Sequence, residues 1–593
     1  MQLATIDWIV ITVCLAAAFA PAVFFARRAG KGTTEFFASG RAAPWWLIGT
    51  SMVATTFSTD TPNLVTDFVR TKGVAQNWAW WAFLLTGMMT VFFYSRMWRR
   101  SGVLTDLEFY ELRYSGRSAA FLRGFRAVYL GLFFNCAIMA SVTLAAVKIA
   151  NVMLGWDRLQ TVVVCGAICI VFSALSGLWG VLAADMIQFA IAMVGVFIAA
   201  YVALSHPAVG GLEGLVAQID PATLRLLPDF SDWGLTLSVL VVPLTIQWWS
   251  VWYPGAEPGG GSYIAQRMLA AKDERHAMAA TLWFNIAHYA LRPWPWVIIA
   301  LCSILVFPTL DDLQTALPHV SQELIGNDMA YPAMLTLLPA GILGLLIASL
   351  LSAYVSTMST HLNWGCSYLV HDLYRRFLRP DASEHHLVWL SRVMTAVLMG
   401  VSGWAVFFLS TAGEAFQLLL SIGAGTGLIY LLRWFWWRIN AWSEIAAMAS
   451  SFVIALSLFF ARRGGLDLSA HGALVLSVLA TTIVWVVVTL LTPPSDDETL
   501  RRFYASVRPA GSGWRRVVGD EAPAGDRDSL GLALLGWVLG CTFVYSALFG
   551  TGALLYGQTS QGLLCMAVAA AAGGGLVWLV PRIWRPASTP EQA

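Results

Sequence analysis

A polar interruption inside an apolar stretch is the first place where this sequence could do chemistry. The stretch 45–69 contains SMVATTFSTDTPN, so Asp60, Pro62 and several Ser and Thr break an otherwise apolar span. Proline removes a backbone donor and clashes with the preceding turn, which would free carbonyls near Ala54 and Phe57 to face a cation. The alternative is a proline kink whose Ser and Thr side chains bond back to their own helix.

A second polar face is encoded in the stretch 331–370, which contains ASLLSAYVSTMSTHLN. Ala353, Ser356, Thr357 and Thr360 recur at i, i+3, i+4 and i+7, so they share one face of a helix. Hydroxyl oxygens are hard, neutral ligands of the kind that a small hard cation prefers. A small-residue seam between packed helices is the alternative, because Ser and Thr are common in such seams.

A carboxylate also stands inside an apolar run. Asp185 occurs in GVLAADMIQFAIAMVG, close to the start of the run 179–204. An acidic side chain within a membrane span is rare unless it pairs with a cation or another polar group. The alternative is a carboxylate that interacts with the dipole of its helix near the membrane surface.

Two further polar residues are candidates for contact with a solute. His288 occurs in FNIAHYALRPWPW, and Gln247 precedes WWSVWYPGAEPGGG. A histidine beside aromatic residues is more often a packing residue with its hydrogen bonds satisfied. The glycine-rich PGAEPGGG lacks the Lys-Ser/Thr of a phosphate loop, so we interpret it as an irregular break beside a pathway.

The composition requires that these residues be positioned by membrane-spanning helices. Of 593 residues, 58% are hydrophobic and only 12% are charged, and the mean hydropathy is +0.67. A chain this apolar cannot cover a water-soluble globule with polar side chains. The net charge of +2 predicts no nucleic-acid partner. All eight Cys fall inside apolar runs, which predicts neither a disulfide framework nor a metal site.

About fifteen apolar runs are long enough to cross a bilayer as helices. Arg27, Arg28 and Lys31 follow the first run instead of preceding it, so we interpret that run as a retained helix and not as a signal peptide. The runs are 8–26, 45–69, 77–98, 125–153, 158–176, 179–204, 232–252, 279–307, 331–370, 386–410, 413–433, 441–461, 470–492, 530–553 and 561–581.

The distribution of basic residues predicts the orientation of the chain in the cell membrane. With the N-terminus outside and the helices alternating, most basic loops, the segment 493–528 and the C-terminal tail fall on the cytoplasmic side, as the positive-inside rule requires. The segment 493–528 is too short for a domain and is predicted to be a cytoplasmic loop. The sequence therefore predicts one membrane domain over 1–593, without an attached enzymatic or sensory module.

Four segments of the chain, taken in order, resemble the sodium:solute symporter family, which includes the sodium/glucose and sodium/proline transporters. They are FFASGRAAPWWLIGTSMVATTFS, FSALSGLWGVLAADMIQ, SYIAQRMLAAKDERHA and SAYVSTMSTHLNWGCSYLVHDLY, and the resemblance covers most of residues 1–440. It implies an all-α polytopic membrane protein with the inverted repeat of two five-helix units of the LeuT type. The units would be 45–204 and 232–433, after a leading helix at 8–26 and before peripheral helices in 441–581.

The resemblance also implies a sodium site at the first two polar interruptions. Its ligands would be the backbone carbonyls of Ala54, Phe57 and Ala353 and the hydroxyls of Ser356 and Thr357. Some family members have a second sodium site, whose counterpart here would be Asp185 with Ser356, Ser359 and Thr360. The cofactor implied is therefore Na⁺, one ion or two.

The solute positions depart from those of the sugar-transporting members. Thr61, Trp80 and Phe83 stand where those proteins have polar or acidic groups, His288 stands at a lysine position, and Leu420 stands at a glutamine position. These differences argue against a galactose-type pocket. The chain also carries an insertion between Gln247 and Tyr263, so the match of Gln247 to the family's binding helix is open.

The resemblance predicts a sodium-coupled symporter that moves a small polar organic solute into the cell by alternating access. The solute could be sugar-like, amino-acid-like or an organic acid. The alternatives are a solute sensor that does not transport and a proton-coupled symporter. We expect no enzymatic activity, because no nucleophile and base stand at useful spacing. The expected partners are the solute, sodium ions and the lipid bilayer, with no obligate protein partner.

Overall fold

The chain folds almost entirely into helices. A computed structural model describes residues 3–56, 58–250, 257–318, 320, 322, 325–409, 423, 425–519 and 529–583. Over these residues no β-strand forms, and the only bridge is an isolated parallel one between Ala43 and Ala271. The prediction of an all-α protein is confirmed.

Ten helical elements of the described residues are long and apolar enough to cross a membrane. They are α1 (Thr5–Ala29), Gly116–Leu154 (the spans of α9, η4 and α10), α11 (Arg158–Leu204), Glu274–Val306 (α17, η7 and α18), Ile342–Leu378 (α21 and η10), Glu384–Phe408 (α22 and η11), α25 (Ala441–Arg463), α26 (Ala470–Leu491), α29 (Leu530–Leu555) and α30 (Thr559–Ile583). This confirms a multi-pass membrane protein. The count of about fifteen spans stays a prediction.

The longest helix, α11, is divided by a glycine. Its 47 residues would extend about 70 Å at 1.5 Å per residue, which is more than twice the thickness of a bilayer core. At Gly177 the backbone turns to φ +51°, where only glycine is free of strain, and the helix resumes beyond it. The break divides the element close to the predicted boundary between the runs 158–176 and 179–204.

We expect Gly177→Ala to destabilise the protein by about 1–3 kcal/mol. A Cβ at this position would lie 2.7 Å from the Cβ of Ala29 on α1, in addition to the unfavourable φ. Gly400→Ala in α22 (Glu384–Ala405) is the matched control, because a Cβ there meets nothing within 4 Å and helical Ala is favoured over Gly. Unfolding in detergent measures the stability of both variants. Equal stability would contradict the conclusion that the backbone at position 177 requires glycine.

Two of the predicted spans are broken helices. The first consists of α3 (Trp45–Thr55) and α4 (Asp60–Lys72), with Thr56, Ser58 and Thr59 outside both. Pro62 lies in the first turn of α4, where its missing N–H costs nothing, so the chain can restart a helix there but cannot continue one. The run 45–69 is therefore interrupted and not merely kinked.

The second broken helix follows the same plan. It begins with α14 (Trp233–Thr236), η5 (Leu237–Val241), α15 (Val242–Thr245) and η6 (Gln247–Trp249), and it resumes as α16 (Ser262–Ala270). The predicted run 77–98 is also segmented, into α5 (Trp78–Trp81), α6 (Leu84–Met89), η3 (Thr90–Tyr94) and α7 (Ser95–Ser101). Irregular backbone of this kind inside a membrane protein lies against a cavity or other protein elements and not against lipid.

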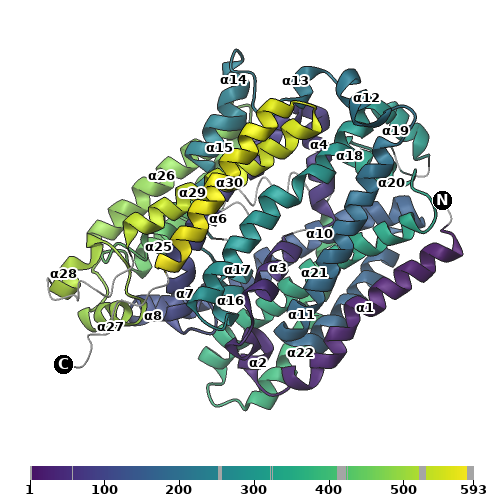
Figure 1. The fold of residues 1–593 in the computed structure, drawn as a ribbon. Helices are drawn as coiled ribbons and strands as arrows, with labels where there is room; N and C mark the ends of the chain where they lie inside the picture. The colour runs from purple at the N-terminus through teal and green to yellow at the C-terminus, as the bar shows by residue number, and fades with distance from the viewer. Residues whose placement is uncertain are drawn as a thin grey trace.

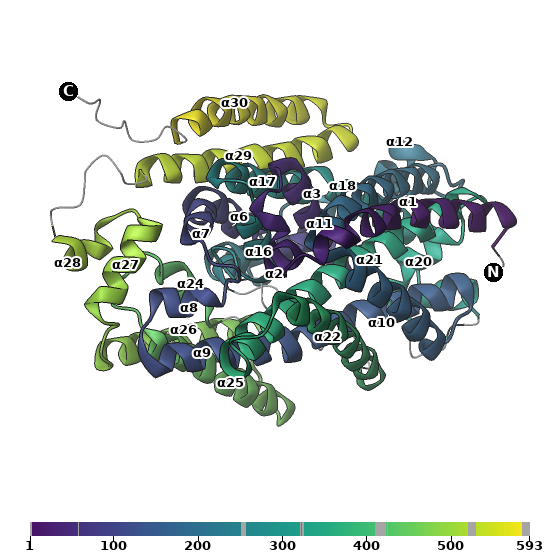
Figure 2. The ribbon, with the colours of Figure 1, turned by 90° about the horizontal axis from the view of Figure 1, so that it is seen from below.

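The core of the molecule is built around α21 (Ile342–Ser367), which packs against α1, α3, α10 (Asn135–Leu154), α11 and α22. The C-terminal helices α29 and α30 run side by side (Figure 1). Viewed from below, α25 lies on the opposite side of the molecule from α29 and α30 (Figure 2). The described part of 493–528 forms α27 (Asp497–Val507), η12 (Ser512–Trp514) and α28 (Arg515–Val518).

Candidate functional site

The break after α3 faces α21 directly. The hydroxyl of Thr357 on α21 donates to the backbone carbonyl of Thr55 at 2.9 Å. Ala54 on α3 and Ala353 on α21 are each only 2% exposed. The predicted sodium residues on these two helices are therefore brought together at the end of α3, whereas Phe57 lies outside the described residues.

The oxygens at this junction have the chemistry that Na⁺ requires. They are neutral carbonyl and hydroxyl groups, and the C-terminal end of α3 adds the partial negative charge of its helix dipole. Thr357 donates its proton to the Thr55 carbonyl, and its hydroxyl oxygen is an acceptor of the kind that can ligate a cation. The residues present thus fit a sodium ion.

Asp185 is fully buried against the same face of α21. Its carboxylate accepts from Ser51 on α3 and, at 2.6 Å, from the hydroxyl of Ser356 on α21. Thr360 shares a hydrogen bond of 3.0 Å with Thr55, whereas the hydroxyl of Ser359 donates to the Ser356 carbonyl at 3.1 Å. The structure therefore gathers Asp185, Ser356 and Thr360, and it directs the Ser359 proton to the backbone.

A cation of the protein itself lies in this second cluster. The guanidinium of Arg267, on α16, donates to Thr360 at 2.6 Å and to Ser51 at 3.3 Å, and its Nη2 lies 3.8 Å from the Asp185 carboxylate. Arg267 is fully buried. Sequence reasoning placed this arginine in a family motif but not in the site. The signal that could have identified it was an arginine in the same membrane-embedded region as an unpaired aspartate.

A pocket opens beside the break and contains three of the predicted solute residues. Thr61, Trp80 and His288 all line it, and so does Thr357 of the sodium junction. The pocket has an empty volume of about 630 Å³, including its part open to solvent. The other lining residues are Thr55, Thr56, Ser58, Asp60, Leu64, Val65 and Tyr263. Asp60, which sequence reasoning treated only as part of the helix break, is the acidic member of this set.

His288 is fixed by a buried arginine. Arg292 lies one turn away, and its Nη2 is 2.5 Å from Nδ1 of His288. A guanidinium can only donate, so Nδ1 accepts and the proton of the neutral ring is on Nε2. Arg292 also donates to the carbonyls of Val53 at 2.9 Å and Thr56 at 3.1 Å. The carbonyls of Val53 and Thr56 at the end of α3 therefore face Arg292, whereas the placing of a bound cation at Ala54 and Phe57 stays a prediction.

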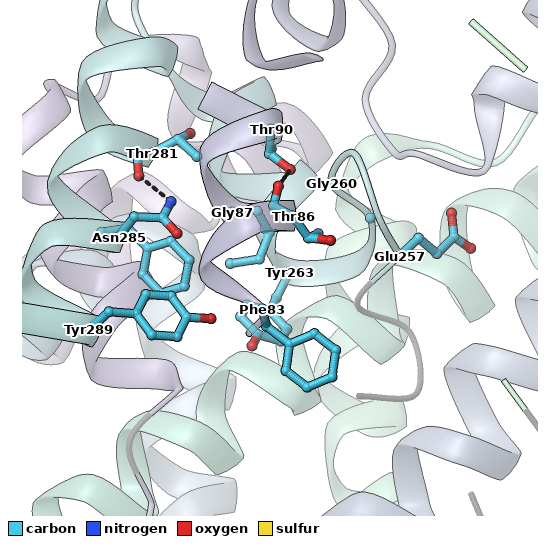
Figure 3. Close-up of a pocket in the computed structure, with 13 residues that line it drawn as sticks. Phe83, Thr86, Gly87, Thr90, Glu257, Gly260, Tyr263, Thr281, Asn285 and Tyr289 are labelled. Carbon is cyan, nitrogen blue, oxygen red and sulfur yellow. Dashed lines mark hydrogen bonds between the residues drawn. The ribbon is translucent and has the colours of Figure 1, made fainter. Parts of the chain in front are cut away.

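A second pocket adjoins the first and contains Phe83 (Figure 3). Thr281, Asn285 and Tyr289 lie along one wall, Thr86, Gly87 and Thr90 along another, and Glu257 lies at the opposite end. Tyr263 lines both pockets, so it stands between them. Trp80 and Phe83, about one helical turn apart in sequence, thus line different pockets.

The two remaining solute predictions fall outside both pockets or outside the described chain. The side-chain amide of Gln247 donates to the carbonyl of Ala79 at 2.7 Å, which fastens η6 to α5. Gln247 does not line either pocket of the described residues. Leu420 lies outside the described residues, so its role stays a prediction.

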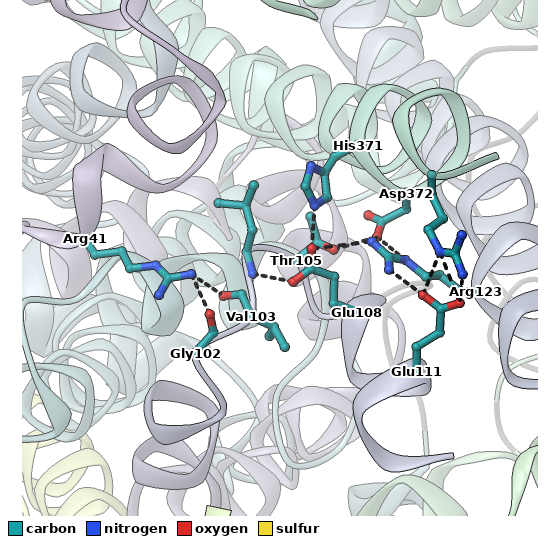
Figure 4. Close-up of polar contacts among 11 residues, drawn as sticks. Arg41, Gly102, Val103, Thr105, Glu108, Glu111, Arg123, His371 and Asp372 are labelled. Carbon is teal, nitrogen blue, oxygen red and sulfur yellow. Dashed lines mark hydrogen bonds and ion pairs between the residues drawn. The ribbon is translucent and has the colours of Figure 1, made fainter. Parts of the chain in front are cut away.

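A polar network fastens α8 (Glu108–Arg113) to α9 (Gly116–Val128) and η10 (Tyr368–Leu378), as Figure 4 shows. Arg123 pairs with Asp372 and Glu111, each at 2.7 Å, and with Glu108 at 3.4 Å. His371 binds the same Glu108 carboxylate. Burial raises the pKa of Glu108, but the hydrogen bond of His371 and the charges of His371 and Arg123 outweigh it and lower the pKa to about 2.

This network predicts an acid-sensitive contribution to stability. The pKa of Glu108 is lower in the folded than in the unfolded state, so its stabilisation is complete above pH 4.5 and is lost as the pH falls toward 2. Between pH 6 and pH 3, the free energy of unfolding should fall by about 1–2 kcal/mol more for the native chain than for Glu108→Gln. Thermal unfolding at each pH measures this difference. Glu213→Gln on exposed α12 (Gly211–Gln218) is the control and should behave as the native chain. Parallel pH profiles for native and Glu108→Gln proteins would contradict the prediction.

Comparison with known proteins agrees with this architecture. A model of the sodium:solute symporter family matches residues 36–453. The chain is 25% identical over 488 residues to a sodium/glucose cotransporter of Vibrio parahaemolyticus, covering 79% of this chain and 86% of the relative. It is 26% identical over 453 residues to the human sodium/myo-inositol cotransporter 2, covering 71% and 64% of the two chains.

Among solved structures, a Na⁺-coupled sialic acid symporter in a substrate-bound outward-open state shares the fold. The TM-score is 0.67 with 21% sequence identity, and the alignment covers 84% of this chain and 99% of that one. The family match extends over well more than half of the chain and includes both broken helices and α21. The chain belongs to the sodium:solute symporter family.

Proposed function

We propose that this protein is a sodium-coupled symporter that moves a small polar organic solute into the cell by alternating access. The observation that carries the proposal is the contact of Thr357 with the broken end of α3 at the wall of a polar pocket. One side chain then belongs both to the ion site and to the solute pocket. An ion and a solute that share a wall can favour the same conformation, which is the physical meaning of coupling.

The proposed sodium site uses the carbonyls of Ala54, Phe57 and Ala353 and the hydroxyls of Ser356 and Thr357. An ion bound there would hold the end of α3 against α21 and thereby order the pocket at the break. The inward sodium gradient and the membrane potential would drive the cycle, and the potential supplies about 2.3 kcal/mol per charge per 100 mV.

We propose that one sodium ion is bound in this conformation. Asp185, Ser356, Ser359 and Thr360 were expected to form a second site, but the Arg267 guanidinium already faces Asp185 and donates to Thr360. A sodium ion placed there would meet the arginine charge at close range with a single carboxylate to balance both. Occupancy by Na⁺ would therefore require Arg267 to leave.

The finer architecture is part of the same proposal. The two five-helix units would span 45–204 and 232–433, and each would open with one of the two broken helices. Their inverted arrangement would bring the two breaks together near the midplane, where transporters of this kind bind their cargo. The N-terminus would lie outside and the C-terminus in the cytoplasm.

Uptake into proteoliposomes tests the proposal. We expect a transported solute to accumulate only with an inward Na⁺ gradient and to stop when K⁺ replaces Na⁺ or the gradient is collapsed. Accumulation driven by a proton gradient without Na⁺ would replace the proposal with proton-coupled symport. Solute binding without accumulation under any gradient would favour a sensor that does not transport.

A further inference from the structure

Asp60 places a carboxylate in the solute pocket, where the charge of Arg292 acts on it but no described ion pair joins the two side chains. It is the first residue of α4, it is half-buried, and it lines the pocket together with Thr61 and Trp80. Its side-chain contact is with the Thr61 hydroxyl, at the long distance of 3.5 Å. The carboxylate also accepts from the backbone N–H groups of Asp60 and Thr61 at the N-terminus of α4. The N-terminus of α4 and Arg292 stabilise this carboxylate in part, and its position in the pocket leaves it available to a cationic group of the solute.

The positive groups nearest to the pocket are engaged elsewhere. Arg292 donates to the carbonyls of Val53 and Thr56 and to the ring of His288. The positive charge of Arg292 thus lies against the carbonyls at the C-terminal end of α3, which is the negative end of the helix dipole. Because Nδ1 of His288 accepts from Arg292, the neutral ring presents only an Nε2–H donor. Arg292 therefore acts on Asp60 through its charge, while its described hydrogen bonds go to the end of α3 and to His288.

The remaining walls suit a positively charged nitrogen. The Ser58 hydroxyl is buried at the pocket and has no hydrogen-bond partner among the described residues. Trp80 directs its indole N–H away, to Asn77 at 2.9 Å, so the ring itself lines the pocket. Tyr263 adds a second aromatic ring. Hydroxyl acceptors and aromatic faces around one carboxylate are the usual surroundings of a bound ammonium group.

We infer that the transported solute carries a protonated amine, which pairs with Asp60, and that this residue sets the charge specificity of the pocket. The inference rests on the proposed function and names its substrate class. An organic acid would place a second negative charge beside Asp60 in a site of low dielectric constant. A neutral polyol would leave the carboxylate without its counter-charge.

A matched panel of probes tests the inference directly. D-glucosamine, D-glucose and D-glucuronate share one scaffold and differ in charge, and ethanolamine, ethylene glycol and glycolate form a smaller set of the same kind. Thermal stability in Na⁺ and Na⁺-driven uptake are measured for each probe at neutral pH. We expect the amine of at least one set to stabilise the protein and to be transported, and its neutral and acidic counterparts to be at least about 10-fold weaker.

Substitution of Asp60 separates recognition from folding. Asp60→Asn should weaken amine binding by about 100-fold, whereas Asp60→Glu should retain the charge selectivity. Without solute, Asp60→Asn should still fold and keep the Na⁺ stabilisation of the native chain, which separates loss of the amine from loss of the fold. Asp67→Asn, on the same helix but outside the pocket, is the matched control and should leave amine affinity unchanged.

The charge carried per solute gives an independent readout. An amine moved with one Na⁺ carries two charges per solute, whereas a neutral solute carries one. Na⁺-driven uptake of a neutral or acidic probe with unchanged affinity in Asp60→Asn would overturn the inference and leave the symport proposal standing. Loss of Na⁺ stabilisation in Asp60→Asn without solute would assign Asp60 to the ion and would also overturn it. Amine binding that is equal in Na⁺ and K⁺ would instead contradict sodium coupling.

Discussion

Replacing Thr357 with alanine is expected to abolish the stabilisation that Na⁺ gives to the protein. The native chain should unfold at a higher temperature in Na⁺ than in K⁺, because an ion that binds only the folded state adds RT ln(1 + [Na⁺]/Kd), about 2.7 kcal/mol at 100 times Kd. Thr357→Ala removes the hydroxyl that joins α21 to the Thr55 carbonyl at the end of α3. The Na⁺–K⁺ difference in thermal unfolding at equal ionic strength is the measurement.

Two controls separate an ion ligand from a structural hydroxyl. Thr357→Ser keeps the oxygen and should retain most of the sodium effect. Thr489→Ala removes a buried hydroxyl of α26 that has two hydrogen bonds, to Ser443 and Trp485, so it should lower stability equally in both salts. If Thr357→Ala also lowered stability equally in Na⁺ and K⁺, Thr357 would be a helix-packing residue and the sodium site would need other ligands.

The same substitution should uncouple the solute from sodium. Thr357 lines the solute pocket and also belongs to the proposed sodium site. Its substitution therefore removes a sodium ligand together with the contact that links the ion to the solute. By reciprocity, a solute that binds more tightly in Na⁺ than in K⁺ in the native chain should lose that preference in Thr357→Ala. Solute affinity in K⁺ should change little by comparison.

The membrane fold and the register of α21 could be predicted because local sequence determines both. Hydropathy identifies spans, since the bilayer removes every other way to satisfy the backbone. The i, i+3, i+4, i+7 spacing from Ala353 to Thr360 is a property of one helix, so it placed these side chains on one face before any partner was known. The break at Pro62 is likewise a local event.

The arginines of the site could not be assigned in the same way. Arg267 meets Asp185 only because α16 packs against α3 and α21, which no local pattern specifies. Arg292 stands on the end of α3 for the same reason. Asp60 was visible as an ionisable residue in an apolar run, but its direction into the pocket depends on the exact point where α4 restarts. Tertiary packing determines which groups a buried charge contacts and which way its side chain points. Sequence periodicity carries no information about either.

Removing Arg267 is expected to convert its position into a true cation site. Arg267→Met leaves the buried Asp185 carboxylate without its arginine, which should cost about 3–5 kcal/mol in K⁺. In Na⁺ the carboxylate, with the hydroxyls of Ser356 and Thr360, can take an ion instead, so much of the loss should be recovered. Thermal unfolding in the two salts therefore gives a larger Na⁺ effect in this variant than in the native chain.

A double substitution tests whether Asp185 is the cause. Arg267→Met with Asp185→Asn removes both charges, so its stability in K⁺ should exceed that of Arg267→Met alone, and its extra Na⁺ effect should vanish. In uptake assays the Na⁺ dependence should steepen from one ion to two in Arg267→Met only. A native chain that already couples two Na⁺ per solute would contradict the assignment, because Arg267 would then have to leave Asp185 in each cycle. An Arg267→Met variant equally unstable in both salts would show that the arginine holds α16 in place without standing in for an ion.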